Sequence, residues 1–189
     1  MRKIFIDCGF YTGQSIRLFK KRPEFDQTFE FFAFEPAISP KQAQQFPNIT
    51  IYNKAVWIYD GEIEFKKSKR RKGKANGLFR NPFAYKEVCI NVQCIDFSQW
   101  IKDNFSKEDY IVIKMDIEGA EYEVLDKMLK DNTVEYVDLM FIEYHYDRRS
   151  DIDKKDFLEL RRKMIHESGV KCLTSIEWLH KRGKGKDIQ

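Results

Sequence analysis

The chain has 189 residues, of which 42% are hydrophobic and 34% charged, and its formal net charge is +4. This length and composition predict one hydrophobic core, hence a single domain over residues 1–189, and exclude a fully disordered chain. The mild positive charge does not by itself indicate nucleic-acid binding. No apolar run approaches the ~20 residues of a membrane-spanning helix, so we expect a cytoplasmic protein whose contact with any membrane is peripheral.

The first half of the chain alternates β-rich runs with amphipathic ones. The expected elements are strands at 3–7, 29–35 and 49–56, with helices at 13–22 and 39–46 between them. This alternation is typical of a parallel sheet with crossover helices. Two further β-rich runs, at 61–67 and 87–95, predict a β-hairpin inserted into it.

The second half of the chain resumes the alternation. Its expected elements are a helix at 97–105, a strand at 110–116, a helix at 119–131, a strand at 135–145, a helix at 153–167 and one or two strands within 170–179. The apolar runs "YIVI" and "VDLMFI" suit central strands covered on both faces. The pattern predicts an α/β fold with a mostly parallel sheet and helices on both sides.

Four cysteines are present, and none forms a C-x-x-C pair or a metal-finger spacing. Their apolar or strand-like surroundings predict reduced, buried thiols. They are Cys8, Cys89, Cys94 and Cys172.

The first predicted strand ends in an acid and runs into a turn that contains two glycines. In "FIDCGFYTGQS", Asp7 is followed by Gly9 and Gly13, where a helix begins. Glycines let the backbone turn tightly and approach a ligand, and the start of a helix offers free N–H groups. A plain tight turn in which Asp7 caps the helix is the alternative.

The second predicted strand ends in "FAFEP", which places Glu35 twenty-two residues after Gly13. An acid at this strand tip accepts hydrogen bonds from ribose hydroxyls in nucleotide-binding folds. Pro36 ends the strand beside it. The spacing D-x-G-x-x-x-G differs from the dinucleotide pattern G-x-G-x-x-G, and so favours S-adenosylmethionine, which carries no phosphate, over NAD.

Acidic residues gather where the strand at 110–116 ends. In "KMDIEGAEYEVL", Asp116, Glu118 and Glu121 surround Gly119. Because this strand is expected beside the first, Asp116 and Glu118 should face the reactive end of the cofactor. We expect Glu121 only to complement the dipole of the helix start and to cap its free N–H groups.

The following strand ends in "FIEYHYD", where Glu143, His145 and Asp147 alternate. In an extended strand, Glu143 and His145 project to the same side, toward Asp116 and Glu118. A hydroxyl acceptor needs a base or a Lewis-acid metal, and carboxylates with one imidazole suit Mg²⁺ or Mn²⁺. We expect Glu118 as the base, with His145 at an ordinary pKa of about 6.5 as the alternative. Asp116 and Glu143 are the expected metal ligands, and a metal-free proton-transfer site is the other interpretation.

Five segments together resemble the FkbM family of S-adenosylmethionine-dependent methyltransferases. They are "FIDCGFYTGQS", "FAFEP", "NKAVWIYDGEIEF", "VQCIDFSQWI" and "IKMDIEGAEYEVL". The resemblance spans residues 3–145, and the D-I-E-G-A-E block is its most specific part. It implies the Rossmann-like class I methyltransferase fold, with a seven-stranded sheet whose last strand is antiparallel, and O-methylation of a sugar, a glycoconjugate or a related small acceptor.

The resemblance also implies a cofactor site in which the glycine turn shapes the methionine pocket, Glu35 holds the ribose, and Asn53 and Ala55 lie beside the adenine. The implied cofactor-binding residues are Asp7, Gly9, Tyr11, Thr12, Gly13, Glu35, Asn53, Ala55 and Asp116.

Residues 66–74 hold seven Lys or Arg in nine positions. One interpretation is a solvated loop at the hairpin tip, and the other is guidance of an anionic acceptor such as a sugar nucleotide or an acidic glycan. Phe79, Phe83 and Tyr85 follow, either packing the hairpin or stacking on RNA. We rank nucleic acid well below a sugar.

The chain begins almost directly on its first strand, without helices that would close over an acceptor. We therefore expect the acceptor site to be completed by the hairpin, by the loop after Tyr144, by a partner subunit or by a further domain. Arg148 and Arg149 in that loop are either anion contacts or exposed residues.

Three other functions stay open. A NAD-dependent oxidoreductase is disfavoured by the missing G-x-G-x-x-G and the missing Tyr-x-x-x-Lys relay. A binding module without catalysis is disfavoured by the full set of acids. An RNA methyltransferase is the alternative within the same enzyme class.

Overall fold

The structure is a computed structural model that describes residues 1–68, 76–79, 87–146, 149 and 151–174. Its main sheet has six strands in the order β3-β2-β1-β7-β8-β9, and every neighbouring pair is parallel. The strands are β1 (Lys3–Cys8), β2 (Phe29–Phe34), β3 (Thr50–Tyr52), β7 (Tyr110–Met115), β8 (Leu139–Ile142) and β9 (Lys171–Thr174).

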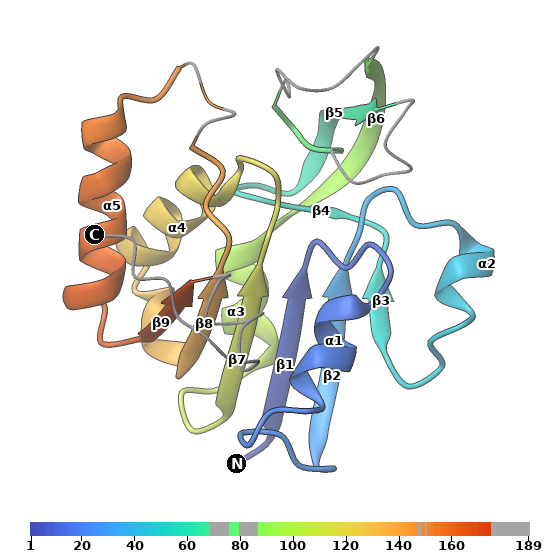
Figure 1. Ribbon diagram of the computed structural model, residues 1–189, viewed down its shortest axis with the longest axis vertical. Coiled ribbons are helices and arrows are strands. Elements are labelled where there is room, and N and C mark those ends of the chain that lie inside the picture. The colour runs from blue at the N-terminus through green and yellow to red at the C-terminus, as the bar shows by residue number, and fades with distance from the viewer. Residues whose placement is uncertain (69–75, 80–86, 147–148, 150, 175–189) are drawn as a thin grey trace, which may run out of the picture.

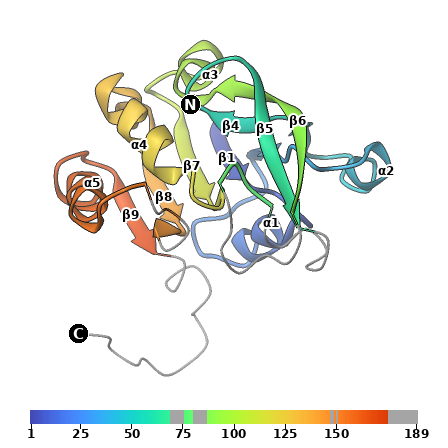
Figure 2. The same ribbon diagram turned by 90° about the horizontal axis from the view of Figure 1, so that it is seen from above.

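Helices cover both sides of the sheet. Figure 2 shows α1 on one side and α3 and α4 on the other. The α-helices are α1 (Gln14–Phe19), α2 (Pro40–Ala43), α3 (Phe97–Asn104), α4 (Glu121–Lys130) and α5 (Lys154–His166). The predicted Rossmann-like architecture is confirmed. Within the described ranges, no helix has both the length and the apolar character needed to cross a bilayer.

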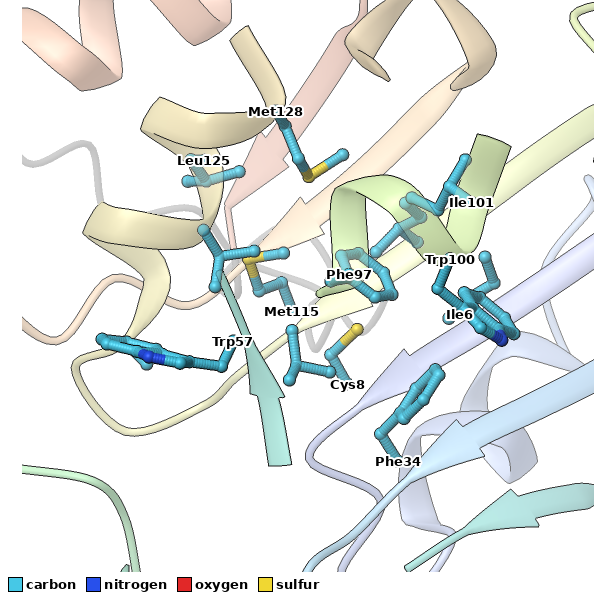
Figure 3. Close-up of a cluster of buried hydrophobic side chains, with 14 of the residues drawn as sticks. Ile6, Cys8, Phe34, Trp57, Phe97, Trp100, Ile101, Met115, Leu125 and Met128 are labelled. Atoms are coloured by element: carbon cyan, nitrogen blue, oxygen red, sulfur yellow. The ribbon is translucent and has the colours of Figure 1, made fainter. Parts of the chain in front are cut away.

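The strand side chains alternate between two hydrophobic clusters. In β1, Ile4, Ile6 and Cys8 belong to the cluster under α3 and α4, whereas Phe5 belongs to the cluster under α1. This period of two is what an extended strand buried on both faces produces. Figure 3 shows side chains from α3 and α4 packing on the strands in the first cluster.

A second, three-stranded sheet has the order β4-β6-β5. Its strands are β4 (Ala55–Trp57), β5 (Gly61–Ser68) and β6 (Glu87–Asp96). β5 and β6 pair antiparallel from Gly61 opposite Cys94 to Ser68 opposite Glu87. The inserted hairpin is therefore confirmed, and its partner β4 runs parallel to β6.

The prediction of a single strand at 49–56 is wrong. The chain leaves the main sheet after β3 and enters the second sheet at β4. The Asn53 side chain lies at this switch. Its Nδ2 donates to the carbonyl oxygens of Glu35, Pro36 and Ile38, at 3.2, 3.3 and 3.0 Å. Asn53 thus braces the turn after β2.

The strand expected at 135–145 is also shorter than predicted. Asn132 adopts a left-handed φ of 56°, and a 3₁₀ helix, η1 (Thr133–Tyr136), follows before β8 begins. Asp138 then accepts from the Ile111 amide at 2.8 Å, which sets the register of β8 beside β7.

The expected seventh, antiparallel strand was not found in the described part of the chain. There, β9 is the edge strand of the main sheet on the side of β8. Residues 175–189, where the chain continues, lie outside that part.

The prediction of buried cysteines is confirmed for Cys8 and Cys94, and Cys172 is partly buried. It is wrong for Cys89, which β6 exposes to solvent.

Candidate active site at the carboxyl ends of the strands

A pocket of about 320 Å³ lies where β1, β2, β7 and β8 end beneath the second sheet. Figure 1 shows the carboxyl ends of these strands pointing toward that sheet. This is the edge at which open α/β sheets bind ligands, and the volume suits a small molecule. The predicted site residues that line it are Gly9, Tyr11, Glu35, Ala55, Asp116, Glu118, Glu143 and His145.

Four other predicted residues do not line this pocket. Asp7 is fully buried behind it, and Thr12 is exposed elsewhere. Gly13 has a φ of +67°, and a Cβ there would come within 2.9 Å of the Phe10 ring, so Gly13 faces the core under α1. Asn53 braces the turn after β2, as described above.

Gly9 brings the turns after β1 and β7 into direct contact. Its φ is +89°, and a Cβ would lie 2.0 Å from the Asp116 carbonyl oxygen. The Gly9 amide donates to Phe34 O at 3.1 Å, and the Asp116 amide donates to Cys8 O at 3.0 Å. Only glycine fits this position, because the backbone of the neighbouring turn occupies the space of a side chain.

Glu35 is held by two backbone amides at the tip of β2. Tyr11 N donates to its Oε2 and Ala37 N to its Oε1, both at 3.0 Å. Burial raises the pKa of Glu35, although both hydrogen bonds act in the opposite direction. The carboxylate is thereby fixed on the pocket wall with lone pairs left for a ligand.

Lys114 is a buried site residue to which sequence reasoning gave no role. Its Nζ lies 3.1 Å from Asp116 Oδ2, 3.2 Å from Gly9 O and 3.6 Å from Asp7 Oδ1. Burial acts to lower the pKa of Lys114, but the charges of Asp7 and Asp116 outweigh it, and the net shift is upward. The available signal was a lysine inside an apolar strand, because buried lysines are nearly always paired.

Asp7 is the buried counter-charge of this lysine. Burial raises the pKa of Asp7 to about 6, partly offset by Lys114 and by the Ser15 hydroxyl, which donates to Asp7 Oδ2. Its side chain does not cap α1, since Gly13 occupies the N-cap position. The alternative interpretation of Asp7 as a helix cap is therefore wrong.

Asp116, Glu118, Glu143 and His145 come together as predicted. His145 Nε2 lies 3.7 Å from Glu143 Oε1, 3.8 Å from Asp116 Oδ1 and 3.9 Å from Glu118 Oε2. β8 ends at Ile142, so the loop after the strand, and not an extended strand, places Glu143 and His145 here. Asp147 lies outside the described residues.

The expectation of an ordinary pKa for His145 is wrong. Its Nδ1 lies 3.0 Å from Glu121 Oε1. Burial lowers the pKa of His145, but the Glu121 hydrogen bond and the charges of Glu121, Asp116 and Glu143 raise it to about 9. The imidazole is therefore protonated at neutral pH and cannot accept a further proton there.

Glu121 does more than was predicted for it. It accepts from the amides of Ile117 and Gly119, both at 2.9 Å, and so caps the turn before α4 as expected. It is also only 2% exposed and contacts His145. Sequence reasoning missed this second contact because the two residues are far apart in the chain.

Glu118 sits in a strained turn that the inserted segment covers. Its φ is +61°, and Gly119 follows at +108°. A left-handed non-glycine residue costs on the order of 1 kcal/mol or more, and such strain concentrates at functional sites. A Cβ on Gly77 would lie 2.8 Å from Glu118 Cβ, so Gly77 packs directly on this turn.

The prediction of Arg149 as an anion contact is wrong, as is its alternative as an exposed residue. Its side chain is 4% exposed and pairs with Glu123 and Asp151. It also donates to Gly119 O at 2.8 Å and stacks 3.6 Å from the centre of the Phe79 ring. Its donors are therefore used inside the protein. Arg148, Phe83, Tyr85 and 69–75 lie outside the described residues.

Asp116, Glu143 and His145 form a donor set suited to a divalent cation. One ligand atom from each lies within 4.8 Å of the others. Two carboxylates and an imidazole are compatible with Mg²⁺ or Mn²⁺, provided that the imidazole is neutral.

The family comparison agrees with this geometry. The model of the methyltransferase FkbM domain matches residues 7–172, a range that contains every site residue named above. Searches among curated proteins and among solved structures gave no match. The glycine turn and the acidic strand tips lie within the matched range, and the chain belongs to the FkbM methyltransferase domain family.

Proposed function

We propose that the protein is an S-adenosylmethionine-dependent O-methyltransferase acting on a hydroxyl of a sugar or glycoconjugate. The main support for this proposal is the acidic lining of the pocket. Glu35, Asp116, Glu118 and Glu143 line it, and no Lys or Arg is among the described lining residues. Such a wall attracts the cationic sulfonium and repels the pyrophosphate of NAD.

The pocket residues fit the parts of this cofactor. Glu35 would accept hydrogen bonds from the ribose hydroxyls, and the turn at Gly9 and Tyr11, with Asp116, would hold the methionine end. An apolar wall for the adenine is formed by Ala55, Val56, Phe65 and Leu78. When bound, the cofactor supplies an electrophilic methyl group on a sulfonium.

We assign Glu118 as the base that takes the proton of the acceptor hydroxyl. It lines the pocket and lies on the turn that Gly77 and Arg149 fix in place. His145 is protonated at neutral pH and so has no lone pair free to take a proton, and its Nε2 lies 3.9 Å from Glu118 Oε2. The alternative assignment of His145 as the base is less favourable for the same reason.

We further propose that Asp116 and Glu143 bind Mg²⁺ or Mn²⁺, with His145 as a third ligand. A metal and the imidazole proton exclude each other, because only neutral histidine is a ligand. Either one supplies positive charge to the acidic cluster. A bound metal would act as a Lewis acid on the acceptor hydroxyl.

A thermal-shift experiment with S-adenosylhomocysteine and NAD tests the cofactor assignment. We expect S-adenosylhomocysteine, the product form of the cofactor, to raise the melting temperature of the protein, and NAD to leave it unchanged. A rise with NAD alone would overturn the proposal.

A panel of sugar nucleotides, neutral glycans and RNA, with formation of S-adenosylhomocysteine as the readout, then identifies the acceptor. Methylation of RNA alone would favour the alternative enzyme, and no turnover on any acceptor would favour a binding module.

A further inference from the structure

We infer that Lys114 is a positioning residue that joins the two turns of the site and orients the Asp116 carboxylate toward the pocket. This inference rests on the proposed function. It concerns a residue beneath the pocket wall, since Lys114 does not line the pocket itself.

Lys114 reaches acceptors on both neighbouring strand tips. It stands opposite Asp7 in the parallel pairing of β1 and β7. From there its Nζ contacts Gly9 O, in the turn after β1, and Asp116 Oδ2, in the turn after β7. One ammonium group therefore links the turn that would hold the methionine end to the turn that carries the acids.

The contact with Lys114 fixes the orientation in which the Asp116 carboxylate faces the pocket. Oδ2 lies 3.1 Å from Lys114 Nζ, whereas Oδ1 points toward His145 Nε2, 3.8 Å away. Without the ammonium, Oδ2 of Asp116 would face the buried Asp7 carboxylate with no cation on that side, and only His145, beside Oδ1, would attract the side chain. Like charges at such short range repel, and the side chain would rotate away from this orientation.

A purely structural role for Lys114 is the competing explanation. The side chain of Lys114 is 11% exposed and that of Asp7 is 0% exposed, so removal of one charge leaves the other buried and unpaired. Breaking such a pair strongly destabilises a protein, whereas neutralising both partners is far less costly. Stability and orientation can therefore be separated by changing both residues.

The experiment compares Asp7→Asn, Lys114→Met and the double variant. Calorimetric unfolding gives stability, and titration with S-adenosylhomocysteine gives affinity. We expect the double variant to recover most of the melting temperature that Lys114→Met loses. We also expect it to bind S-adenosylhomocysteine about tenfold more weakly than Asp7→Asn, the change that corresponds to one charged hydrogen bond. Affinity within twofold of Asp7→Asn would overturn the inference.

Lys114→Gln in the Asp7→Asn background provides a second test, because its amide still donates but carries no charge. We expect affinity between those of Asp7→Asn and the double variant with Met. Equal affinity for the Gln and Met variants would contradict an orienting hydrogen bond.

The matched control is Lys127→Met, which removes ion pairs to Asp96 and Asp131 away from the pocket. It should leave affinity unchanged, and a loss equal to that of the Lys114 variants would contradict a local effect. Failure of the unmodified protein to bind S-adenosylhomocysteine would instead refute the proposed function, so the two failures are distinguishable.

Discussion

His145 is the point at which the acids of the site meet a positive charge. Glu121 contacts one ring nitrogen, while Asp116, Glu118 and Glu143 lie within 4 Å of the other. Carboxylates at such distances stabilise the imidazolium against the cost of burial. His145 and Lys114 therefore compensate part of the negative charge of the strand-end acids, and the pocket keeps an acidic wall.

The raised pKa of His145 predicts a loss of stability in alkaline solution. Its pKa is about 9 in the folded protein and about 6.5 when unfolded. The stabilisation is thus complete below pH ~6.5 and is lost as the pH rises through ~9. In urea titrations with a chelator at pH 6.5 and pH 9.5, the unmodified protein should lose on the order of 2 kcal/mol more unfolding free energy than His145→Gln. Equal pH dependence of both proteins would refute this linkage.

Metal binding should depend on pH for the same reason. Mn²⁺ must displace the proton of His145, so its affinity should rise by about tenfold per pH unit between pH 7 and pH 9. Calorimetry with Mn²⁺ measures this, with Glu143→Gln as a variant expected to bind much more weakly. Binding that Glu143→Gln leaves intact, or turnover insensitive to a chelator, would remove the metal from the scheme.

At the scale of elements, the inserted segment holds the turn that carries the proposed base. Gly77 exchanges two backbone hydrogen bonds with Lys66 on β5, at 2.8 and 3.0 Å, and packs on Glu118. Phe79, two residues on, lies under the Arg149 guanidinium. The inserted segment thus contacts the site through residues 76–79.

Gly77→Ala should therefore impair turnover more than folding. Its Cβ would lie 2.8 Å from Glu118 Cβ, so one of the two segments must shift. We expect a stability loss of roughly 1 to 3 kcal/mol and a large fall in kcat on the acceptor that the screen identifies. The fall in kcat should exceed the fall in S-adenosylhomocysteine affinity, to which the neighbouring Leu78 contributes as a pocket residue.

The control for this variant is Gly169→Ala. Gly169 has a φ of +75° and no neighbour within 4 Å, so alanine there strains the backbone by about 1 kcal/mol far from the site. Unchanged kcat in Gly77→Ala, or an equal fall in both variants, would show that the segment does not position Glu118.

At the scale of the whole molecule, periodicity was enough to predict the parallel sheet, because β1, β7 and β8 are apolar on both faces. It failed at 49–56, where one side chain, Asn53, replaces strand pairing with hydrogen bonds to a turn. Local patterns do not contain such contacts between distant segments.

Local sequence patterns also failed to predict the contacts between distant segments at the candidate site. The strand-tip acids were predictable because parallel strands end at one edge, and Asp116 and Glu118 indeed lie there with His145. The partners of Lys114, Glu121 and Arg149 were not, since each depends on contacts across the fold. Sequence therefore predicted the pocket wall better than the charged groups that support it.

Calorimetric titration of S-adenosylhomocysteine into Glu35→Ala and Glu118→Gln tests the central claim most directly. Glu35→Ala should bind at least about tenfold more weakly, because the ribose loses a charged acceptor. Glu118→Gln should bind as the unmodified protein does and be inactive on the identified acceptor. An equal loss of affinity in both variants, or no loss in Glu35→Ala, would contradict the division of the pocket into a cofactor end and a catalytic end.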